Sequence, residues 1–190
     1  MPMNSAHKRL CSSRTWARTT EEQILPWALE GLDLGDDVLE LGPGYGANLR
    51  VLVERVARLT AVEIDPATVR LLERRYGDRA RVLLGDAAEL TLPDGAFSAV
   101  VCFTMLHHVP TDLHQDRIFA EAFRVLRPGG VFAGSDSLPS VPFRALHVGD
   151  TMNTLDPDGL PARLTAAGFT GVATGLDGRG RRVRFRAHRP

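Results

Sequence analysis

The feature that most constrains the fold is a regular alternation of short β-branched runs with longer helical patterns. Five apolar runs have the length and composition of buried strands, at 37–41, 58–63, 80–84, 98–103 and 131–135. Stretches with helical spacing lie between or after them, at 47–55, 66–76, 112–126 and 158–167. Strands joined by helix-length connections form right-handed βαβ units in a parallel sheet that is covered on both faces. The alternation therefore predicts a doubly wound α/β domain.

The end of the chain departs from this alternation. In RRVRFRAHRP (181–190), Val183, Phe185 and Ala187 alternate with arginines, which is the period of a half-buried strand. The preceding GVATGLDG (171–178) fits a partner strand, so we expect an antiparallel hairpin at the sheet edge. The predicted fold class is a Rossmann-like, doubly wound, mostly parallel sheet of seven strands with a C-terminal antiparallel hairpin.

Some element boundaries have recognisable chemistry. Asp65 precedes a proline and is expected to cap the helix at 66–76. Thr19 and Glu22 fit a capping box, with Pro26 interrupting the helix that would follow. RPGG at 127–130 predicts a turn before the next strand.

Composition fits one globular domain spanning residues 1–190. Lys+Arg and Asp+Glu number 23 each, so no net charge draws the protein to nucleic acid or to anionic membranes. The two cysteines, Cys11 and Cys102, are expected to be reduced thiols, because Cys102 lies in a buried apolar run. No apolar run is long enough to span a membrane, and the N-terminus has no apolar signal core. We expect a cytoplasmic monomer or homodimer that does not bind membranes.

A glycine loop follows the first predicted strand, in VLELGPGYGANL (38–49). Gly42, Gly44 and Gly46 permit a tight turn and close approach of a ligand at the carboxyl end of a parallel strand. Glu63 ends the next strand, 19 residues after Gly44, where an acid can accept hydrogen bonds from both hydroxyls of a ribose. Together they indicate an adenosine-containing cofactor. The alternative is a glycine turn beside a surface glutamate.

Two acids favour S-adenosylmethionine over NAD. Glu40 lies two residues before the first glycine, where a carboxylate suits the ammonium group of a methionine moiety but would repel a pyrophosphate. Asp86, in GDAAEL (85–90), can accept a hydrogen bond from an adenine amino group, with the Ala87 amide nearby to contact a ring nitrogen. The alternative for Asp86 is a cap on a short turn.

Four segments resemble the class I S-adenosylmethionine-dependent methyltransferases: VLELGPGYG (38–46), AVEIDPATV (61–69), GDAAELTLPDGAFSAVVCFTMLHHV (85–109) and RVLRPGGVF (124–132). The resemblance runs from about residue 20 to the C-terminus. It implies S-adenosyl-L-methionine as cofactor and S-adenosyl-L-homocysteine as product. It also implies roles for individual residues: the glycine loop and Glu40 at the methionine part, Glu63 at the ribose, Ile64 and Asp86 at the adenine, and Phe103 and Thr104 beside the methionine moiety.

The acceptor is less well defined. Similar glycine-loop and AVEIDP segments occur in rRNA adenine N6-methyltransferases, but the Asn-Leu-Pro-Tyr type signature of those enzymes is replaced here by CFTMLHHV (102–109). There is also no additional basic domain for folded RNA. TMLHHV is more similar to family members that act on small molecules, so nucleic acid is not the expected substrate. His107 or His108 would then serve as base, or would only hydrogen-bond the loop backbone.

Residues 136–157 form a connection longer than usual for an α/β fold, and we expect a substrate-binding insertion there. Its candidate substrate residues are Asp136, Phe143, His147, Asp150 and Met152. The alternative is an ordinary packing helix around 143–147. Residues 1–20 are expected to form an N-terminal extension or lid, or else a plain basic helix. No metal site is expected, because the adjacent histidines lack an i,i+4 partner.

The sequence is also compatible with other functional classes. They are a nucleotide-dependent oxidoreductase, a non-catalytic S-adenosylmethionine-binding protein, and an enzyme that uses the charge of the cofactor for another reaction. Glu40, Asp86 and the lack of a separate substrate domain argue against the first.

Overall fold

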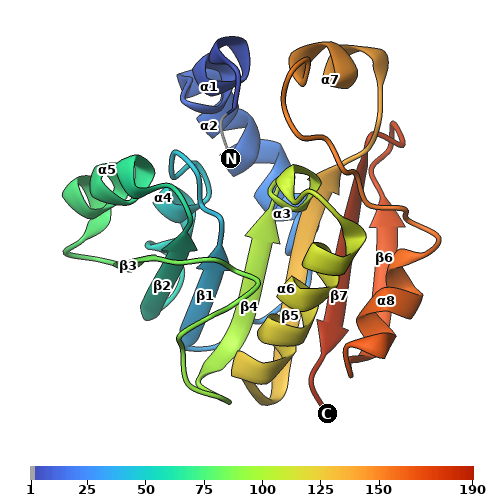
Figure 1. Cartoon of the computed structure of the whole chain (residues 1–190). Helices are drawn as coiled ribbons and strands as arrows, with labels where there is room; N and C mark the ends of the chain where they lie inside the picture. Colours follow the sequence, from blue (N-terminus) through green and yellow to red (C-terminus); the bar gives the residue numbers. More distant parts are fainter. Residues whose placement is uncertain (1–2) are drawn as a thin grey trace.

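A sheet of seven strands forms the centre of the computed structural model, which describes residues 3–190 (Figure 1). The strands are β1 (Asp37–Leu41), β2 (Arg58–Glu63), β3 (Arg81–Leu84), β4 (Phe97–Phe103), β5 (Leu126–Ser137), β6 (Thr170–Leu176) and β7 (Arg182–His188). Their order across the sheet is β3-β2-β1-β4-β5-β7-β6. The first five are parallel, and β7 is antiparallel to both β5 and β6. The predicted fold class and the C-terminal hairpin are confirmed.

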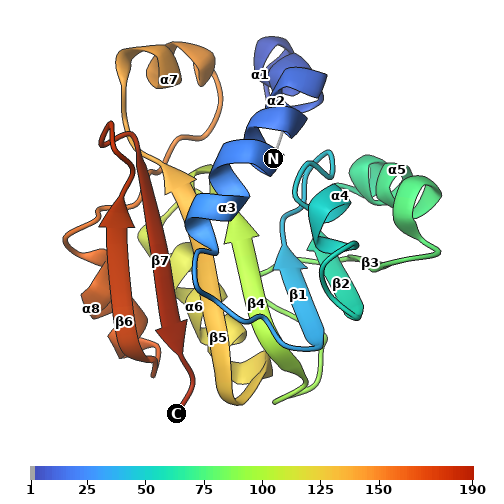
Figure 2. The same cartoon turned by 180° about the vertical axis from the view of Figure 1, so that it is seen from behind.

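Helices cover both faces of the sheet (Figures 1 and 2). They are α1 (Ser5–Cys11), α2 (Arg14–Thr19), α3 (Leu25–Ala28), α4 (Leu49–Leu52), α5 (Pro66–Tyr76), α6 (Asp112–Val125), α7 (Val141–Leu146) and α8 (Leu160–Ala166). α6 and α8 pack on one face, while α3 and α4 pack on the other, with α5 beside β2 and β3. Within residues 3–190, no helix combines the length and the apolar character needed to cross a membrane.

The central strands are apolar throughout because both of their faces are buried. Successive side chains of a strand point to opposite faces. Leu39 and Val100 therefore pack with α6 and α8, and Val38 and Val101 pack with α3 and α4. In β7, Val183, Phe185 and Ala187 are buried as the alternation predicts.

Most predicted elements have the expected place, with differences at their ends. β1, β2 and α5 have the predicted bounds. α8 begins at Leu160 rather than at residue 158, because the Asp156 carboxylate accepts from the amides of Asp158 and Gly159 and forms a turn first. RPGG forms a turn inside β5 rather than before it. Leu126 pairs with Phe97 and Val131 with Ala99, so the four residues between bulge out of the ladder.

The predicted capping box at Thr19 is wrong. Ser13 caps α2, and the helix continues through the π-helical turn Thr20–Ile24 into α3. The Leu25 amide donates to the Thr20 carbonyl in this turn. Pro26 has no amide hydrogen to continue the regular pattern, which accounts for the irregular geometry at this point.

The carboxyl ends of β1, β2, β4 and β5 lie at one edge of the sheet (Figure 1). α1, α2 and α7 lie above this edge in both views (Figures 1 and 2). The glycine loop and the predicted site residues are therefore close to both N-terminal helices and to the 136–157 segment.

Candidate cofactor site and histidine cluster

The glycine loop after β1 adopts backbone conformations that favour glycine. Gly42, Gly44 and Gly46 have φ of 64°, 53° and 83°. A Cβ on Gly42 would lie 2.3 Å from Cγ of Met105, whereas a Cβ on Gly44 would meet nothing within 4 Å. Gly42 is thus required by packing, and Gly44 faces open space that a ligand can enter.

Glu63 holds this loop against the end of β2. One carboxylate oxygen accepts a hydrogen bond from the Gly44 amide at 3.0 Å, and the other accepts from the Asp65 amide at 3.0 Å. Each oxygen keeps a further acceptor position, so these contacts are compatible with binding of ribose hydroxyls. Asp65 caps α5 by accepting from the amides of Ala67 and Thr68, as predicted.

Glu40 is a buried carboxyl group without a nearby cation. It is 0% exposed, and neither of its oxygens has a hydrogen-bond partner of ordinary geometry in the described chain. Burial raises its pKa to about 8; the nearby amide of Asn48 offsets part of this rise, and Glu63 adds to it. An unpaired buried acid of this kind is a good site for a positively charged ligand group.

The predicted adenine side lies at the ends of β2 and β3. Ile64 and Leu84 are large apolar residues that remain 53% and 59% exposed. Asp86 accepts a hydrogen bond from the Ala88 amide at 2.9 Å, so one of its oxygens caps a turn, as the alternative interpretation proposed. Ala87 is half-buried against the core. Two exposed apolar side chains next to an acid form a surface that suits a purine ring.

The end of β4 contains the one strained non-glycine residue of the described chain. Thr104 has φ of 51°, and its amide donates to the Ser135 carbonyl at 2.8 Å. Strain of this kind is often found at functional sites. The Phe103 side chain is 2% exposed and packs in the core with α3 and α4, so only its backbone is available to a ligand.

His107 is held by Asp136. The Asp136 carboxylate accepts from the His107 backbone amide at 3.0 Å, contacts its Nδ1 at 2.5 Å and accepts from the Ser137 amide at 2.6 Å. Asp136 is 0% exposed. Nε2 of His107 is buried and has no hydrogen-bond partner in the part of the chain described.

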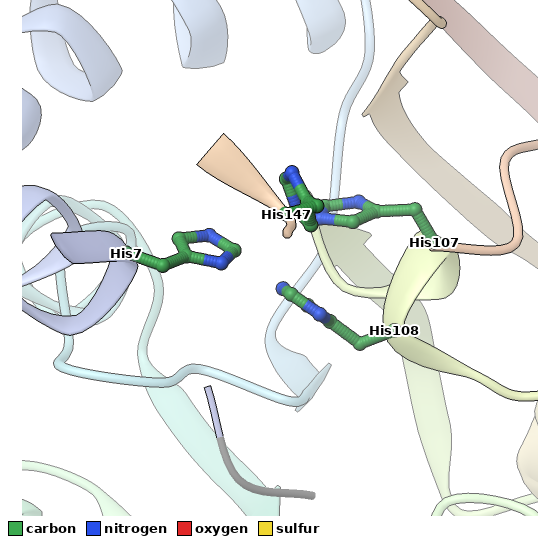
Figure 3. Close-up of side chains that lie close together, drawn as sticks. All are labelled: His7, His107, His108 and His147. Carbon is green, nitrogen blue, oxygen red and sulfur yellow. The ribbon is translucent and has the colours of Figure 1, made fainter. Parts of the chain in front are cut away.

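Three further histidines surround this ring (Figure 3). His7 comes from α1, His108 follows His107 in the turn after β4, and His147 follows α7. Their ring centroids lie between 4.1 and 5.5 Å from those of their neighbours in the cluster. One nitrogen from each ring lies within 4.8 Å of the others. No metal site was expected from the sequence, yet these side chains form a constellation of metal-ligand type. Sequence spacing could not show a cluster that the tertiary fold assembles.

The surroundings of two of these histidines disfavour their protonated forms. Burial, reinforced by the other histidines, lowers the pKa of His108 to about 2. Burial also lowers the pKa of His147, although the Phe143 carbonyl opposes this effect. His108 is consequently neutral at physiological pH and is a weak base.

Hydrogen bonds connect the N-terminal helices to the 136–157 segment. Asp150, 2% exposed at its side chain, contacts Nδ1 of His7 at 2.9 Å and accepts from the Asn4 amide at 2.6 Å. The Asn4 side chain also donates to the Leu146 carbonyl at 2.7 Å. Phe143 packs against His147 with ring centroids 4.1 Å apart. Met152 is half-buried in the next stretch of chain.

Three of the four histidines, His107, His108 and His147, were predicted site residues. His7 and Asn4 were not predicted. Both lie in the segment that was interpreted only as a lid or a basic helix. No local pattern marks them, since their partners lie more than 140 residues away.

The strand order and the glycine loop define a class I, Rossmann-like methyltransferase fold. A family model described as "Methyltransferase domain" matches residues 39–134. The chain belongs to this family, the class I S-adenosylmethionine-dependent methyltransferases.

Similar proteins include other methyltransferases, one of which is named for ribosomal RNA. A Mycolicibacterium smegmatis protein, "Probable S-adenosylmethionine-dependent methyltransferase", is 40% identical over 98 residues, covering 52% of this chain and 37% of its own length. A Synechococcus "Ribosomal RNA small subunit methyltransferase A" is 47% identical over 87 residues, covering 42% and 30%. A chain from the complex of the Haloferax volcanii Trm112 methyltransferase activator with a methyltransferase has a TM-score of 0.76 at 17% identity, with full coverage of both chains. The chain thus spans about a third of the length of these two curated relatives.

Proposed function

We propose that this protein transfers the methyl group of S-adenosylmethionine to O, N or C of a small-molecule acceptor and releases S-adenosylhomocysteine. The observation that carries the proposal is the arrangement of Glu40, the open side of Gly44 and Glu63. A buried unpaired acid, a loop open to a ligand and a second acid with free acceptor positions lie along two neighbouring strands. These features match the ammonium group, the backbone-contacting methionine chain and the ribose of one ligand.

The cofactor's parts would take separate positions. Glu40 and the glycine loop would hold the methionine part, with Glu40 facing its ammonium group. Glu63 would hold the ribose hydroxyls, and Ile64 and Asp86 would hold the adenine ring and its amino group. Thr104 and the Phe103 backbone would border the sulfonium. The strained Thr104 backbone supports this placement.

Methyl transfer needs a nucleophile in line with the methyl–sulfur bond. The bound cofactor would supply an activated methyl group: the acceptor atom would bond to the methyl carbon as the carbon–sulfur bond breaks and its electron pair stays on sulfur. Positioning alone supplies much of the rate. A proton released by a hydroxyl or amine acceptor goes to a base. His107, oriented by Asp136, suits this role better than His108, whose lowered pKa makes it a weak base.

The acceptor would bind under a lid formed by residues 3–20 and 136–157. Hydrogen bonds of Asn4 and the contact between His7 and Asp150 join these two segments over the sheet edge. Phe143, His147, Asp150 and Met152 are the proposed acceptor-binding residues, together with Asp136. Buried imidazole and carboxyl groups beneath these two joined segments favour a small molecule over a folded RNA.

Calorimetric titration with S-adenosylhomocysteine and, in parallel, with NAD⁺ tests the cofactor. We expect micromolar binding of the first only; binding of NAD⁺ alone would refute the proposal. The acceptor class is then tested with S-adenosylmethionine labelled in the methyl group, using a small-molecule extract and small-subunit ribosomal RNA as separate substrates. Label in the RNA alone would replace the small-molecule assignment with the rRNA activity that one relative's name suggests. Cofactor binding without transfer to either would favour a non-catalytic role.

A further inference from the structure

The four histidines form a cluster in which two buried ring nitrogens lack a hydrogen-bond partner among residues 3–190. His7, His107, His108 and His147 offer one ligand nitrogen each, all within 4.8 Å of one another (Figure 3). Nε2 of His107 and of His147 is buried, and neither has a hydrogen-bond partner in residues 3–190. Buried polar atoms are nearly always paired, so two unpaired nitrogens within one histidine cluster require an explanation.

The outer nitrogens of three of these rings are fixed by acceptors. Nδ1 of His7 contacts the Asp150 carboxylate, Nδ1 of His107 contacts the Asp136 carboxylate, and Nδ1 of His147 contacts the Phe143 carbonyl. A carbonyl or an ionised carboxylate can only accept, so each Nδ1 carries the hydrogen. The lone pair of each ring is therefore on Nε2, on the opposite side of the ring.

We propose that His7, His107 and His147 bind a divalent first-row transition-metal ion such as Zn²⁺ through Nε2, with His108 at the fourth position. Imidazole nitrogens suit Zn²⁺ and its neighbours in the series, whereas Mg²⁺ and Ca²⁺ require oxygen ligands. Histidine ligands of zinc usually donate the other ring hydrogen to a carboxylate or a backbone carbonyl, which is the arrangement around these three rings. Two buried carboxylates also provide negative charge next to the ion.

The geometry requires a modest contraction. With Zn–N distances of about 2.0–2.1 Å, the nitrogens of a tetrahedral site lie about 3.4 Å apart. The four nitrogens here are up to 4.8 Å apart, so the rings must move inward by about 1 Å. His108 has no comparable partner among the contacts in the described chain, so it is the ligand that an acceptor heteroatom can displace.

A bound ion would connect three separate parts of the chain. It would join α1, the turn after β4 and the end of α7, and so hold the two lid segments together above the sheet edge. It would also make His107 a ligand rather than a base. The positive charge of the ion would then lower the pKa of an acceptor hydroxyl or thiol that takes the position of His108.

Metal binding can be measured without cofactor or acceptor. A negative result would therefore refute the metal site without bearing on the proposed methyl transfer. The full chain, purified without a histidine tag and treated with EDTA, is titrated with Co²⁺ and then with Zn²⁺. We expect one Co²⁺ per chain, with the intense visible absorption of a tetrahedral site, displaced by one Zn²⁺. We also expect Zn²⁺ to raise Tm. No binding, or binding with purely octahedral spectra, would overturn the proposal.

Four variants locate the ion. His147→Ala should abolish the tetrahedral spectrum, and Asp150→Asn should weaken binding roughly 10- to 100-fold by releasing His7. His108→Ala should retain the ion with an altered spectrum. His114→Ala is the matched control, since His114 is exposed on α6 and lies outside the cluster. If His147→Ala does not fold, His147→Gln with its circular dichroism spectrum replaces it. Unchanged binding in the folded His147 variant, or equal loss in the control, would refute the site.

Discussion

Binding of S-adenosylhomocysteine should release nearly one proton from Glu40 at pH 7. Burial is the main cause that raises the pKa of this carboxyl to about 8, so about 0.9 of the unliganded protein carries the proton at pH 7. The ligand's ammonium group favours the charged carboxylate, and its arrival therefore expels the proton. The quantity expected from the structure is a release of about 0.9 proton per ligand bound.

Calorimetry measures this number directly. The titration is repeated at pH 7 in buffers with different ionisation enthalpies, and the slope of observed enthalpy against ionisation enthalpy gives the protons exchanged. Glu40→Gln should show a slope near zero and a loss of affinity of about 1.5–3 kcal/mol, the range for a hydrogen bond to a charged group. A zero slope in the native protein, or the same slope in both proteins, would refute the placement of the ammonium group beside Glu40.

Glu40→Gln should weaken ligand binding but should stabilise the unliganded protein. The folded pKa lies above the ordinary value of 4.5, so the folded state binds this proton more tightly than the unfolded chain. The contribution of Glu40 is complete below about pH 4.5 and is lost as the pH rises through about 8. Without ligand at pH 8, Glu40→Gln should therefore raise the free energy of unfolding by roughly 1–3 kcal/mol in urea denaturation. A destabilised Gln variant would contradict this reasoning.

Four other substitutions test the site and the sheet. Gly42→Ala places a Cβ 2.3 Å from Met105 and should lower the free energy of unfolding by about 1–3 kcal/mol. A Cβ on Gly44 would meet no atom within 4 Å, so in denaturation Gly44→Ala should lower the free energy of unfolding by only about 1–2 kcal/mol, because of the positive φ. Calorimetry should show that its affinity for S-adenosylhomocysteine falls at least tenfold. Glu63→Gln should weaken S-adenosylhomocysteine binding by about 1.5–3 kcal/mol, and unchanged affinity would remove this residue from the ribose. Gly134→Ala puts a Cβ 2.1 Å from a backbone oxygen of β4 and should lower the free energy of unfolding by about 3 kcal/mol or more. A variant as stable as the native protein would contradict this packing.

The parts predicted from the sequence depend on local chemistry. β1, β2 and α5 have the expected bounds because apolar runs, the Asp65 cap and Pro66 act within a few residues. The position of Glu63 beside the glycine loop follows from the pairing of adjacent parallel strands, and its carboxylate does contact the Gly44 amide.

The histidine cluster could not be predicted because it is purely tertiary. His7 meets His107 and His147 only after two segments close over the sheet edge, and neither segment has periodicity that indicates this contact. The complete burial of Glu40 could not be predicted from the sequence either. The alternation of side chains along a strand predicts which face each side chain takes, but not how deeply the end of the strand is covered.

The bond between the Asn4 amide and Asp150 joins residues 146 positions apart, and this distance has a consequence for synthesis on the ribosome. α1 leaves the ribosome well before its partners at residues 146–150, which are synthesised about 140 residues later. Contacts this distant in sequence carry the largest loop-closure entropy, and they form after the sheet has brought their ends together. These contacts therefore form late, and a chain synthesised only through the glycine loop still lacks them.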